Sequence, residues 1–355
     1  MMTERGSGFL QIQVSHWYLK KIGLNHAPKN MMLKRAKMLK ENRKIILILS
    51  NKYDITTDYV CVELERRGRN YLRLNRDEFN RYRVLVNPLS RELSWSCGEE
   101  TVTLDPTSLQ AVYYRAPTFL RDNYQPDLSA EEQLYRSQWS AFVRDLDIFS
   151  EAIWMNNPVA TYKAENKMLQ LHQANEVGLL CPLTFISNYF PEDRLPSGLS
   201  DIIIKSLDTG LLRMQSQEAF VYTNIVSLEE ARKANYMGAP VILQEHVTSK
   251  VDIRVTVVHN SVFAARILSS GEGIVGDWRK AKDYVQYQHF ELPEDIASKC
   301  VLLVKKLGLS FGAIDLVETN NGFIFIEVNP TGEWAWLVDS AGQEIHKSIC
   351  DYLDG

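Results

Sequence analysis

The sequence GAIDLVETNNGFIFIEVNP, from Gly312 to Pro330, predicts a β-hairpin. Two runs rich in apolar residues, 313–319 and 323–329, flank the short segment Asn320-Asn321-Gly322. A connection of three residues suits a tight hairpin, and glycine readily takes the left-handed conformation that such loops require. The loop length sets the register of the two strands, and the register decides which side chains face each other.

This register would bring three polar side chains onto one face of the hairpin. Pairing Thr319 with Phe323 places Asp315 directly opposite Glu327, and Asn329 lies two residues further along the same face. Cross-strand partners lie roughly 5 Å apart at Cβ, where two carboxylates repel unless a cation lies between them or one is protonated. Oxygen-only ligands favour Mg²⁺ or Mn²⁺ over zinc. A solvated polar face on an ordinary hairpin is the alternative.

Composition places the chain among globular proteins. At 355 residues and 45% hydrophobic content, it can form two or three packed domains. Its longest apolar runs, such as Ile45–Leu49, are far shorter than the ~20 residues that cross a bilayer, and no secretory signal is evident. Five widely spaced cysteines without a C-x-x-C pair are typical of reduced thiols. These features predict a cytoplasmic protein that does not bind membranes.

Charge divides the chain near residue 44. Residues 1–44 carry ten Lys and Arg against two Glu, or +8, which leaves 30 against 42, or −12, for residues 45–355. This basic N-terminal extension could form a helix over 31–44 that binds an acidic peptide or a membrane surface. Disorder, or a start codon assigned too early, are the simpler alternatives. The seven tryptophans and sixteen tyrosines of the chain, together with its acidic body, do not outline a nucleic-acid groove.

An α/β unit is expected over residues 45–158. KIILILS reads as a buried strand, a helix capped by Thr56 or Thr57 follows, and NYLRLN is the next strand. This β-α-β start lacks G-x-G-x-x-G, so it has no dinucleotide-binding phosphate turn. The unit is completed by a meander of short strands at 83–105, a strand that ends near Arg115, and a long helix that begins after Ser129.

Several cationic side chains follow in the second half of the chain. TYKAENKMLQLH reads as part of one helix capped by Thr161, which places Lys163 and Lys167 one turn apart. Lys205 closes the apolar strand DIIIK, where burial of an unpaired ammonium is costly unless an anion such as a phosphate meets it. Three arginines lie near strand or loop ends: Arg254, Arg266 and Arg279.

Together these side chains suit nucleotide phosphate chemistry. Metal ions neutralise and bridge phosphate oxygens, and lysine and arginine stabilise charge as it develops during transfer. The chain has no G-x-x-x-x-G-K-[ST] and no kinase-like catalytic loop. It is therefore expected to be neither a P-loop protein nor a protein kinase.

Five motifs carry a resemblance to a known family. They are YYRAP (113–117), IWMNNPVATYKAENKMLQLH (153–172), VYTN (221–224), DWR (277–279) and IEVNPTGEWAWL (326–337). These motifs are similar to those of the graspetide maturases, the microviridin-type ATP-grasp ligases that cross-link ribosomal peptides. The resemblance implies an ATP-grasp fold of two α+β subdomains, a lid at 159–240 and a catalytic subdomain at 241–355, preceded by a pre-ATP-grasp α/β domain at 45–158.

The resemblance also implies roles for individual residues. Those expected to bind ATP are Lys167 and Lys205 at the phosphates, Gln244, Glu245 and Val247 in the adenine-binding connector, and Asp252 at the ribose or substrate. Those expected to bind Mg²⁺ or Mn²⁺ are Asp315, Glu327 and Asn329. Those expected to act in catalysis are Arg254 and Arg266 at the transferred phosphate and Arg279 at the substrate carboxylate. The lid turn SLDTGLLRMQ departs from the longer glycine-rich loop of many family members.

The implied reaction is a cross-linking of a precursor peptide. ATP would activate an Asp or Glu side chain as an acyl phosphate, and a Ser or Thr hydroxyl or a Lys amine would attack it to give an ester or an amide. Positioning and charge stabilisation suffice for this chemistry, without an enzyme nucleophile. The expected partner is a precursor with a leader and an acidic core rich in Thr, Ser and Lys, and a homodimer is compatible with it. The alternatives are a ligase that adds amino acids to a peptide or small acid, and a nucleotide-binding module without turnover.

Replacing either carboxylate of the hairpin tests the metal interpretation. Asp315→Asn and Glu327→Gln should each abolish ATP-dependent turnover while leaving the fold intact, because each removes a charge that would hold the cation. The measurement is ADP release with an acidic peptide, together with far-UV circular dichroism. Unchanged turnover in either variant would contradict the assignment of these residues as metal ligands.

Overall fold

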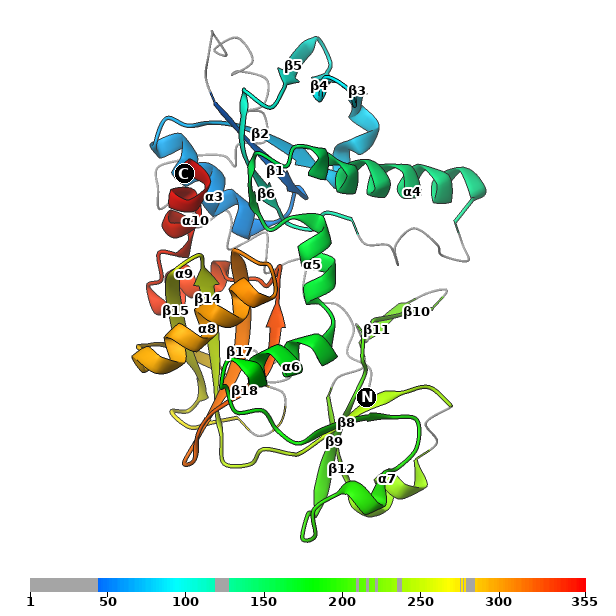
Figure 1. Cartoon of the computed structure of the whole chain (residues 1–355), viewed down its shortest axis with the longest axis vertical. Coiled ribbons are helices and arrows are strands. Elements are labelled where there is room, and N and C mark those ends of the chain that lie inside the picture. Colours follow the sequence, from blue (N-terminus) through cyan, green and yellow to red (C-terminus); the bar gives the residue numbers. More distant parts are fainter. Residues whose placement is uncertain are drawn as a thin grey trace. The chain divides into compact units, whose positions relative to one another are not determined.

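The computed structural model describes residues 44–118, 128–208, 211–214, 217–220, 223–234, 238–274, 276, 278 and 285–355. Its contacts divide the chain into two compact units (Figure 1). Unit 1 runs to Pro158 and also includes His346–Gly355, and unit 2 is Val159–Ile345. The basic extension predicted at 1–44 lies outside the described residues except for Lys44.

Unit 1 is built on a parallel sheet of four strands in the order β2-β1-β6-β7. β1 (Ile45–Ser50) is buried along its whole length and pairs with β2 (Asn70–Asn75) on one side and β6 (Leu109–Tyr114) on the other. β7 (Ile153–Met155) extends the sheet beyond β6, and α3 (Ile55–Arg66) connects β1 with β2. The predicted β-α-β start is confirmed, and the uninterrupted aliphatic run of β1 is typical of a strand covered on both faces.

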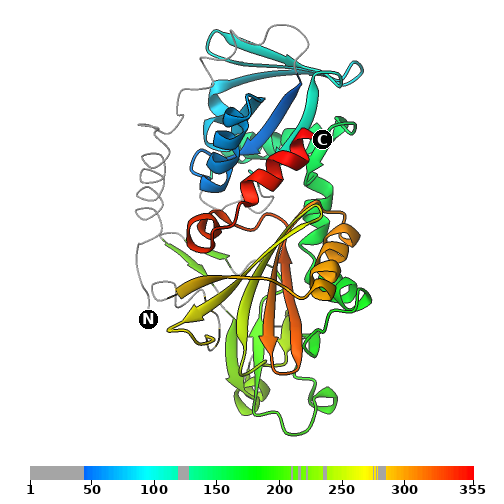
Figure 2. The same cartoon turned by 90° about the vertical axis from the view of Figure 1, so that its left-hand side faces the viewer.

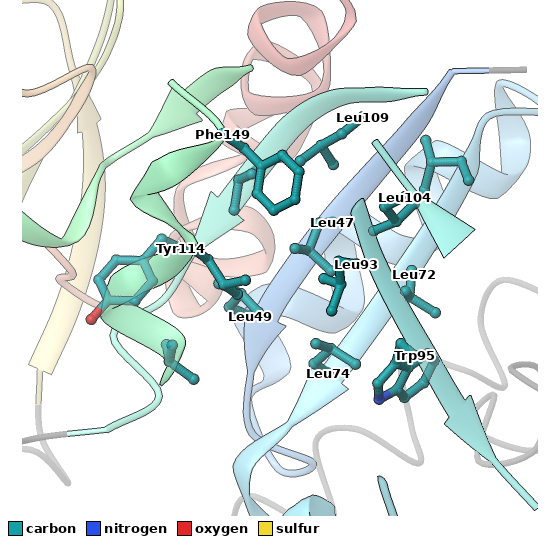
Figure 3. Close-up of a cluster of buried hydrophobic side chains, with 14 of the residues drawn as sticks. Leu47, Leu49, Leu72, Leu74, Leu93, Trp95, Leu104, Leu109, Tyr114 and Phe149 are labelled. Atoms are coloured by element: carbon teal, nitrogen blue, oxygen red, sulfur yellow. The ribbon is translucent and has the colours of Figure 1, made fainter. Parts of the chain in front are cut away.

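The predicted meander is an antiparallel sheet of β3 (Tyr82–Asn87), β4 (Glu92–Cys97) and β5 (Glu100–Leu104). Its inward side chains join one hydrophobic core with the parallel sheet, where Leu93 and Trp95 lie among Leu47, Leu72 and Leu74 (Figure 3). α4 (Ala130–Asp145) begins after Ser129, as expected, and the Ser129 hydroxyl accepts the Glu132 N–H. The 3-10 turns η2 (Arg76–Arg81) and η4 (Leu146–Ile148) complete the unit.

A buried ion pair closes the turn between β1 and α3. The expected threonine cap is wrong: Asp54 caps the helix by accepting the Thr57 N–H, and its Oδ2 lies 3.1 Å from Nε of Arg115. The Ser50 and Thr57 hydroxyls donate to the same carboxylate. Burial would raise the pKa of Asp54, but Arg115 and the hydrogen bonds of Thr56 and Thr57 lower it to about 2. Arg115 is therefore committed to a buried structural contact.

The C-terminal helix α10 (Ile345–Asp354) packs on α3 (Figure 1). Arg67, which follows α3, forms an ion pair with Asp351 at 2.6 Å, and Gln110 donates to two backbone carbonyls at the end of α10. These contacts group residues 346–355 with unit 1. The sequence had placed them in the catalytic subdomain at 241–355, because short-range patterns carry no information on this long-range packing.

Unit 2 contains two larger antiparallel sheets. The first has the order β12-β9-β13-β8 and is formed by β8 (Thr184–Ser187), β9 (Asp201–Lys205), β12 (Asn224–Ser227) and β13 (Val241–Gln244). α7 (Leu228–Lys233) begins with a capping box between Ser227 and Glu230 and buries Ala231 against this sheet. β10 (Leu211–Met214) and β11 (Gln217–Phe220) form a separate hairpin. We refer to the four-stranded sheet β12-β9-β13-β8 as the lid sheet.

The second sheet has the order β16-β15-β14-β17-β18. Its strands are β14 (Val251–Val258), β15 (Ser261–Ser269), β16 (Val285–Phe290), β17 (Phe311–Thr319) and β18 (Gly322–Asn329). α6 (Lys167–Glu176) and α8 (Glu294–Lys306) cover one face, where Ile253, Val255 and Val257 of β14 are buried (Figure 2). The short α9 (Ala335–Ala341) packs Trp336 on the other face, against Ile267. We call this second sheet the main sheet.

The cysteines agree with the composition. All five cysteines are free thiols, as their spacing predicted, and burial raises the pKa of Cys300 to about 12. Among the helices of the described ranges, none is long and apolar enough to cross a membrane.

Asp54→Asn should destabilise unit 1 by about 3 kcal/mol, because it leaves the Arg115 charge buried without its carboxylate. The pKa of Asp54 is lower in the folded state, so this stabilisation is present above the unfolded value of 3.8 and is lost as the pH falls towards 2. Urea unfolding of the wild type and the variant, followed between pH 7 and pH 3, measures both effects.

The exposed ion pair between Arg91 and Glu151 provides the control. Arg91→Ala should change the free energy of unfolding little, because exposed pairs are screened by water. Equal losses in Asp54→Asn and Arg91→Ala would contradict the structural role of the buried pair.

Candidate active site

β17 and β18 form the predicted hairpin, with a shorter loop than expected. Thr319 pairs with Gly322 and not with Phe323, so the loop consists of Asn320 and Asn321 only. Gly322 has a φ of 116°, a conformation that favours glycine. The Thr319 hydroxyl accepts the Asn321 N–H and donates to the Gly322 carbonyl, which stabilises the tight turn. The predicted pairing at the loop is wrong by one residue.

A β-bulge compensates for this difference before the ladder reaches the acidic residues. The register shifts next to Asp315, where Ile326 is the extra residue on β18. Beyond the bulge, Asp315 pairs with Glu327, as the sequence predicted, and Asn329 pairs with Ala313. The two carboxylates therefore face each other, with Asn329 further along the same face.

Two cationic side chains lie against the two carboxylates. Nη1 of Arg254, which pairs with Asp315 across β14 and β17, is 3.1 Å from Oδ1 of Asp315. Nζ of Lys167 is 3.9 Å from Oε2 of Glu327. All four side chains are at least three-quarters buried, so their charges interact more strongly than they would in water.

Lys167 reaches this place because two helices replace the single helix that was expected. α5 (Pro158–Ala164) ends before Asn166, whose side chain caps α6 by accepting a backbone N–H. Lys167 is therefore the first residue of α6 and does not continue a helix from Lys163. Its Nζ also donates to the carbonyl of Ser206 at 3.5 Å, directly after Lys205 at the end of β9. The structure thus brings Lys167 to the residue that follows Lys205 in the chain.

Gln170 holds α6 against the main sheet. β18 is an edge strand, so the outward N–H and C=O of Val328 have no neighbouring strand. The Gln170 side chain accepts that N–H at 2.9 Å and donates to that carbonyl at 2.8 Å. It also donates to the Ala164 carbonyl at the end of α5. Gln170 thereby fixes Lys167 beside Glu327, and only its place in the motif MLQL marked it in the sequence.

The predicted metal ligand Asn329 begins a turn. Its Oδ1 accepts the Thr331 N–H at 3.0 Å, and the side chain is exposed. Gly332 ends this turn so close to β17 that a Cβ at this position would lie 2.4 Å from Cβ of Ala313. The amide oxygen keeps a second lone pair, which suits a cation beside Asp315 and Glu327.

The connector that follows β13 lies between the two sheets in the chain. Gln244 is buried and donates to the Thr184 hydroxyl at 2.9 Å, whereas the Glu245 side chain is exposed and Val247 is half-buried. At the start of β14, Asp252 forms an ion pair with Lys250. These residues occupy the connector and the adjoining strand, as expected, but their contact with a nucleotide remains a prediction.

Arg254 and Arg266 lie on opposite faces of the main sheet. Arg266 pairs with Ile253, so it shares the face covered by α8, whereas Arg254 shares the face of Asp315. Arg266 binds Glu318 through two hydrogen bonds of 2.8 and 2.9 Å, and its guanidinium lies 3.9 Å from the centre of the Phe290 ring. The expected contact of Arg266 with the transferred phosphate does not fit this position. We therefore assign Arg266 a structural role.

Aromatic side chains that we did not anticipate surround Arg254. Its guanidinium carbon lies 6.0 Å from the centre of the Trp336 ring, and the centre of the Tyr287 ring lies 4.3 Å from that of Trp336, with the two ring planes tilted by 46°. Burial raises the pKa of Tyr287, and the positive charge of Arg254 opposes this shift. Nε of Arg254 is buried without a hydrogen-bond partner among the described residues. The motif EWAWL contained the signal for Trp336.

Two of the predicted features lie outside the described residues. Arg279, the candidate for holding the substrate carboxylate, is one of them, together with Asp277 of the same motif. The other is part of the lid turn SLDTGLLRMQ, namely residues 209, 210 and 215. Both stay predictions.

The described residues fit a divalent cation and a phosphate. The donor set is oxygen only, from two carboxylates and an amide, which suits Mg²⁺. Within the described ranges no three His, Cys, Asp or Glu side chains cluster as a metal site. The buried Nε of Arg254, with Lys167 nearby, offers donors for an anion on the same face.

The sequence has relatives among probable α-L-glutamate ligases. The protein of Vibrio atlanticus (strain LGP32) is 23% identical over 224 residues, which cover 61% of this chain and 71% of the relative. The protein of Haemophilus influenzae (strain PittEE) is 24% identical over 215 residues, with coverage of 56% and 67%. No family model matches the chain.

Solved structures of macrocyclases resemble the chain over most of its length. The macrocyclase MdnC, bound with precursor peptide MdnA from Microcystis aeruginosa MRC, has a TM-score of 0.72 at 23% identity and covers 87% of this chain and 99% of its own. MdnB from the same organism has a TM-score of 0.67 at 28% identity, with coverage of 87% and 99%. A Chryseobacterium gregarium RiPP-associated ATP-grasp ligase, in complex with ADP and a leader and core peptide, has a TM-score of 0.74 at 24% identity, with coverage of 88% and 96%. The ATP-grasp fold and the expected resemblance to these enzymes are confirmed.

The two arginines should differ in their effect on turnover. Arg254→Gln should lower kcat about 100-fold, because it removes a preorganised donor beside the carboxylates. Arg266→Gln should keep near wild-type turnover, because its side chain lies on the other face of the sheet. ADP release measured on both purified variants makes the comparison, with thermal unfolding as the check on folding. A large loss in a folded Arg266→Gln variant would contradict the two-face assignment.

Proposed function

We propose that this chain, which has the ATP-grasp fold of the peptide macrocyclases, is an ATP-dependent ligase that cross-links side chains of a ribosomally made precursor peptide. The substrate is a peptide with a leader and a core that carries Asp or Glu together with Ser, Thr or Lys. The products are the macrocyclic peptide, ADP and phosphate, and the reaction takes place in the cytoplasm.

One observation carries this proposal: Asp315 and Glu327 face each other, and each has a cation beside it. Nη1 of Arg254 lies 3.1 Å from Oδ1 of Asp315, and Nζ of Lys167 lies 3.9 Å from Oε2 of Glu327. Facing carboxylates repel each other, and this arrangement holds them together with cations from two other elements. Such a cluster can bind a divalent cation and a polyphosphate at the same time, which is what phosphoryl transfer to a carboxylate requires.

Each residue then has a defined task. Asp315, Glu327 and Asn329 hold Mg²⁺ or Mn²⁺, which supplies charge neutralisation to the phosphates. Lys167 and Lys205 bind the phosphates from α6 and from the lid sheet, and the connector at 244–247 binds the adenine. Arg254 donates to the phosphoryl oxygens, and Arg279 holds the substrate carboxylate. No residue of the chain forms a covalent intermediate, because positioning and charge stabilisation carry the catalysis.

The chemistry balances without further reactants. An oxygen of the substrate carboxylate bonds to the γ-phosphorus as the bond to ADP breaks. A hydroxyl oxygen or an amine nitrogen of the same peptide then bonds to the acyl carbon, phosphate leaves, and one proton is released. Each cross-link therefore removes one water from the peptide.

A second function is favoured by the sequence relatives, which are probable α-L-glutamate ligases. Such an enzyme would use the same ATP site but would join a free amino acid to its acceptor. The two functions differ in the acceptor and not in the cluster of Asp315 and Glu327. They predict opposite changes in the mass of a peptide substrate.

Mass spectrometry of a peptide encoded next to this protein should separate the two functions. We expect ATP-dependent loss of one water for each cross-link, because the acceptor lies in the same peptide. A gain of glutamyl residues on addition of free glutamate would support the second function instead. Glu327→Gln is the negative control, and a mass change with this variant would assign the activity to a contaminant.

A further inference from the structure

We propose that His246 and Asp201 form a positioning pair that fixes the connector for nucleotide recognition. The inference rests on the proposed function, since it concerns the adenine end of the same ATP site. Nδ1 of His246 lies 2.9 Å from Oδ1 of Asp201. A carboxylate only accepts hydrogen bonds, so His246 carries its proton on Nδ1 and donates it.

The pair continues the ladder of the lid sheet beyond the end of β13. β9 and β13 are antiparallel, with Ile242 opposite Lys205 and Gln244 opposite Ile203. Two residues further in this register, His246 stands opposite Asp201, the first residue of β9. The side-chain hydrogen bond thus takes over where the backbone pairing of β9 and β13 ends. Asp201 and Lys205 lie at opposite ends of the same short strand, which therefore links the connector to the phosphate end of the site.

The other side of the connector is held against β8. The Glu245 N–H donates to the Leu183 carbonyl at 2.8 Å, and the Glu245 carboxylate accepts the Leu183 N–H at 3.1 Å. Glu245 and His246 are thus attached to the two strands that flank β13. The backbone groups of the connector are fixed by these contacts before any ligand arrives.

In the proposed function the connector binds the adenine, and this fixation then decides how well its backbone groups can recognise the base. Hydrogen bonds from backbone N–H and C=O groups discriminate adenine only if the groups are already oriented, and ordering them on binding would lower the affinity. The segment that follows the connector is attached to the main sheet and not to the lid sheet. There Lys250 binds Asp252, and Gly273 lies against the Lys250 carbonyl. Among the described residues, His246 is therefore the connector residue furthest along the chain whose side chain binds the lid sheet.

The test is nucleotide binding by the full-length chain with Mg²⁺, measured by calorimetry with ADP and GDP. His246→Ala and Asp201→Ala should each raise the Kd for ADP roughly five- to tenfold, as expected for loss of a charge-assisted hydrogen bond. Both variants should also lower the ratio of the Kd for GDP to the Kd for ADP. His246→Asn keeps a donor near the position of Nδ1 and should restore most of the affinity. At saturating ATP, kcat should stay near the wild-type value in all three variants.

Glu192→Ala is the matched control, because it breaks an ion pair of the same lid region, with Arg232 at 2.7 Å, away from the connector. It should bind ADP as the wild type does. Wild-type affinity in a folded His246→Ala or Asp201→Ala variant, or an equal loss in Glu192→Ala, would overturn the positioning role. Failure of the wild-type chain to bind ADP would overturn the proposed function itself, and the inference with it.

Discussion

The repulsion between Asp315 and Glu327 is the constraint on which the functional part of unit 2 depends. Their Cα atoms are paired on adjacent strands, so the two carboxylates stay together only if cations compensate them. The protein supplies Arg254 from the neighbouring strand and Lys167 from the start of α6. Gln170 supports this arrangement, because its side chain attaches α6, and with it Lys167, to the edge strand β18. An acidic pair supported in this way has the charge distribution that a metal-bound polyphosphate needs.

In the proposed function, the lid sheet contributes the other part of the ATP site. β9 ends at Lys205, beside the Ser206 carbonyl that Lys167 contacts, and it begins at Asp201, which holds His246 of the connector. One strand thus relates the lysines to the connector, which is the arrangement required for a nucleotide that extends from base to phosphates.

The pairing of Asp315 with Glu327 was predicted correctly because two errors in the expected hairpin cancelled. The expected loop was one residue too long, and the bulge at Ile326 restored the pairing of Asp315 with Glu327. The break between α5 and α6 was missed although Asn166, which caps α6, is a residue type favoured at helix N-termini. Arg266 was expected beside Arg254 at the phosphate, but the two lie on opposite faces of the main sheet, because the sequence does not show how β14 and β15 are aligned.

The sequence by itself determined the β-α-β start and the meander of unit 1, the pairing of Asp315 with Glu327 in the local hairpin, and the residue types from which an oxygen-ligated cation and a phosphate site could be inferred. Periodicity and loop length involve residues that are close together in the chain, so they can be recognised from the sequence alone. Only the tertiary structure decided that Lys167 meets Glu327, that Asp201 meets His246, and that Arg115 is buried with Asp54. Each of these contacts joins segments far apart in the chain, and their geometry arises from packing, which no local pattern encodes.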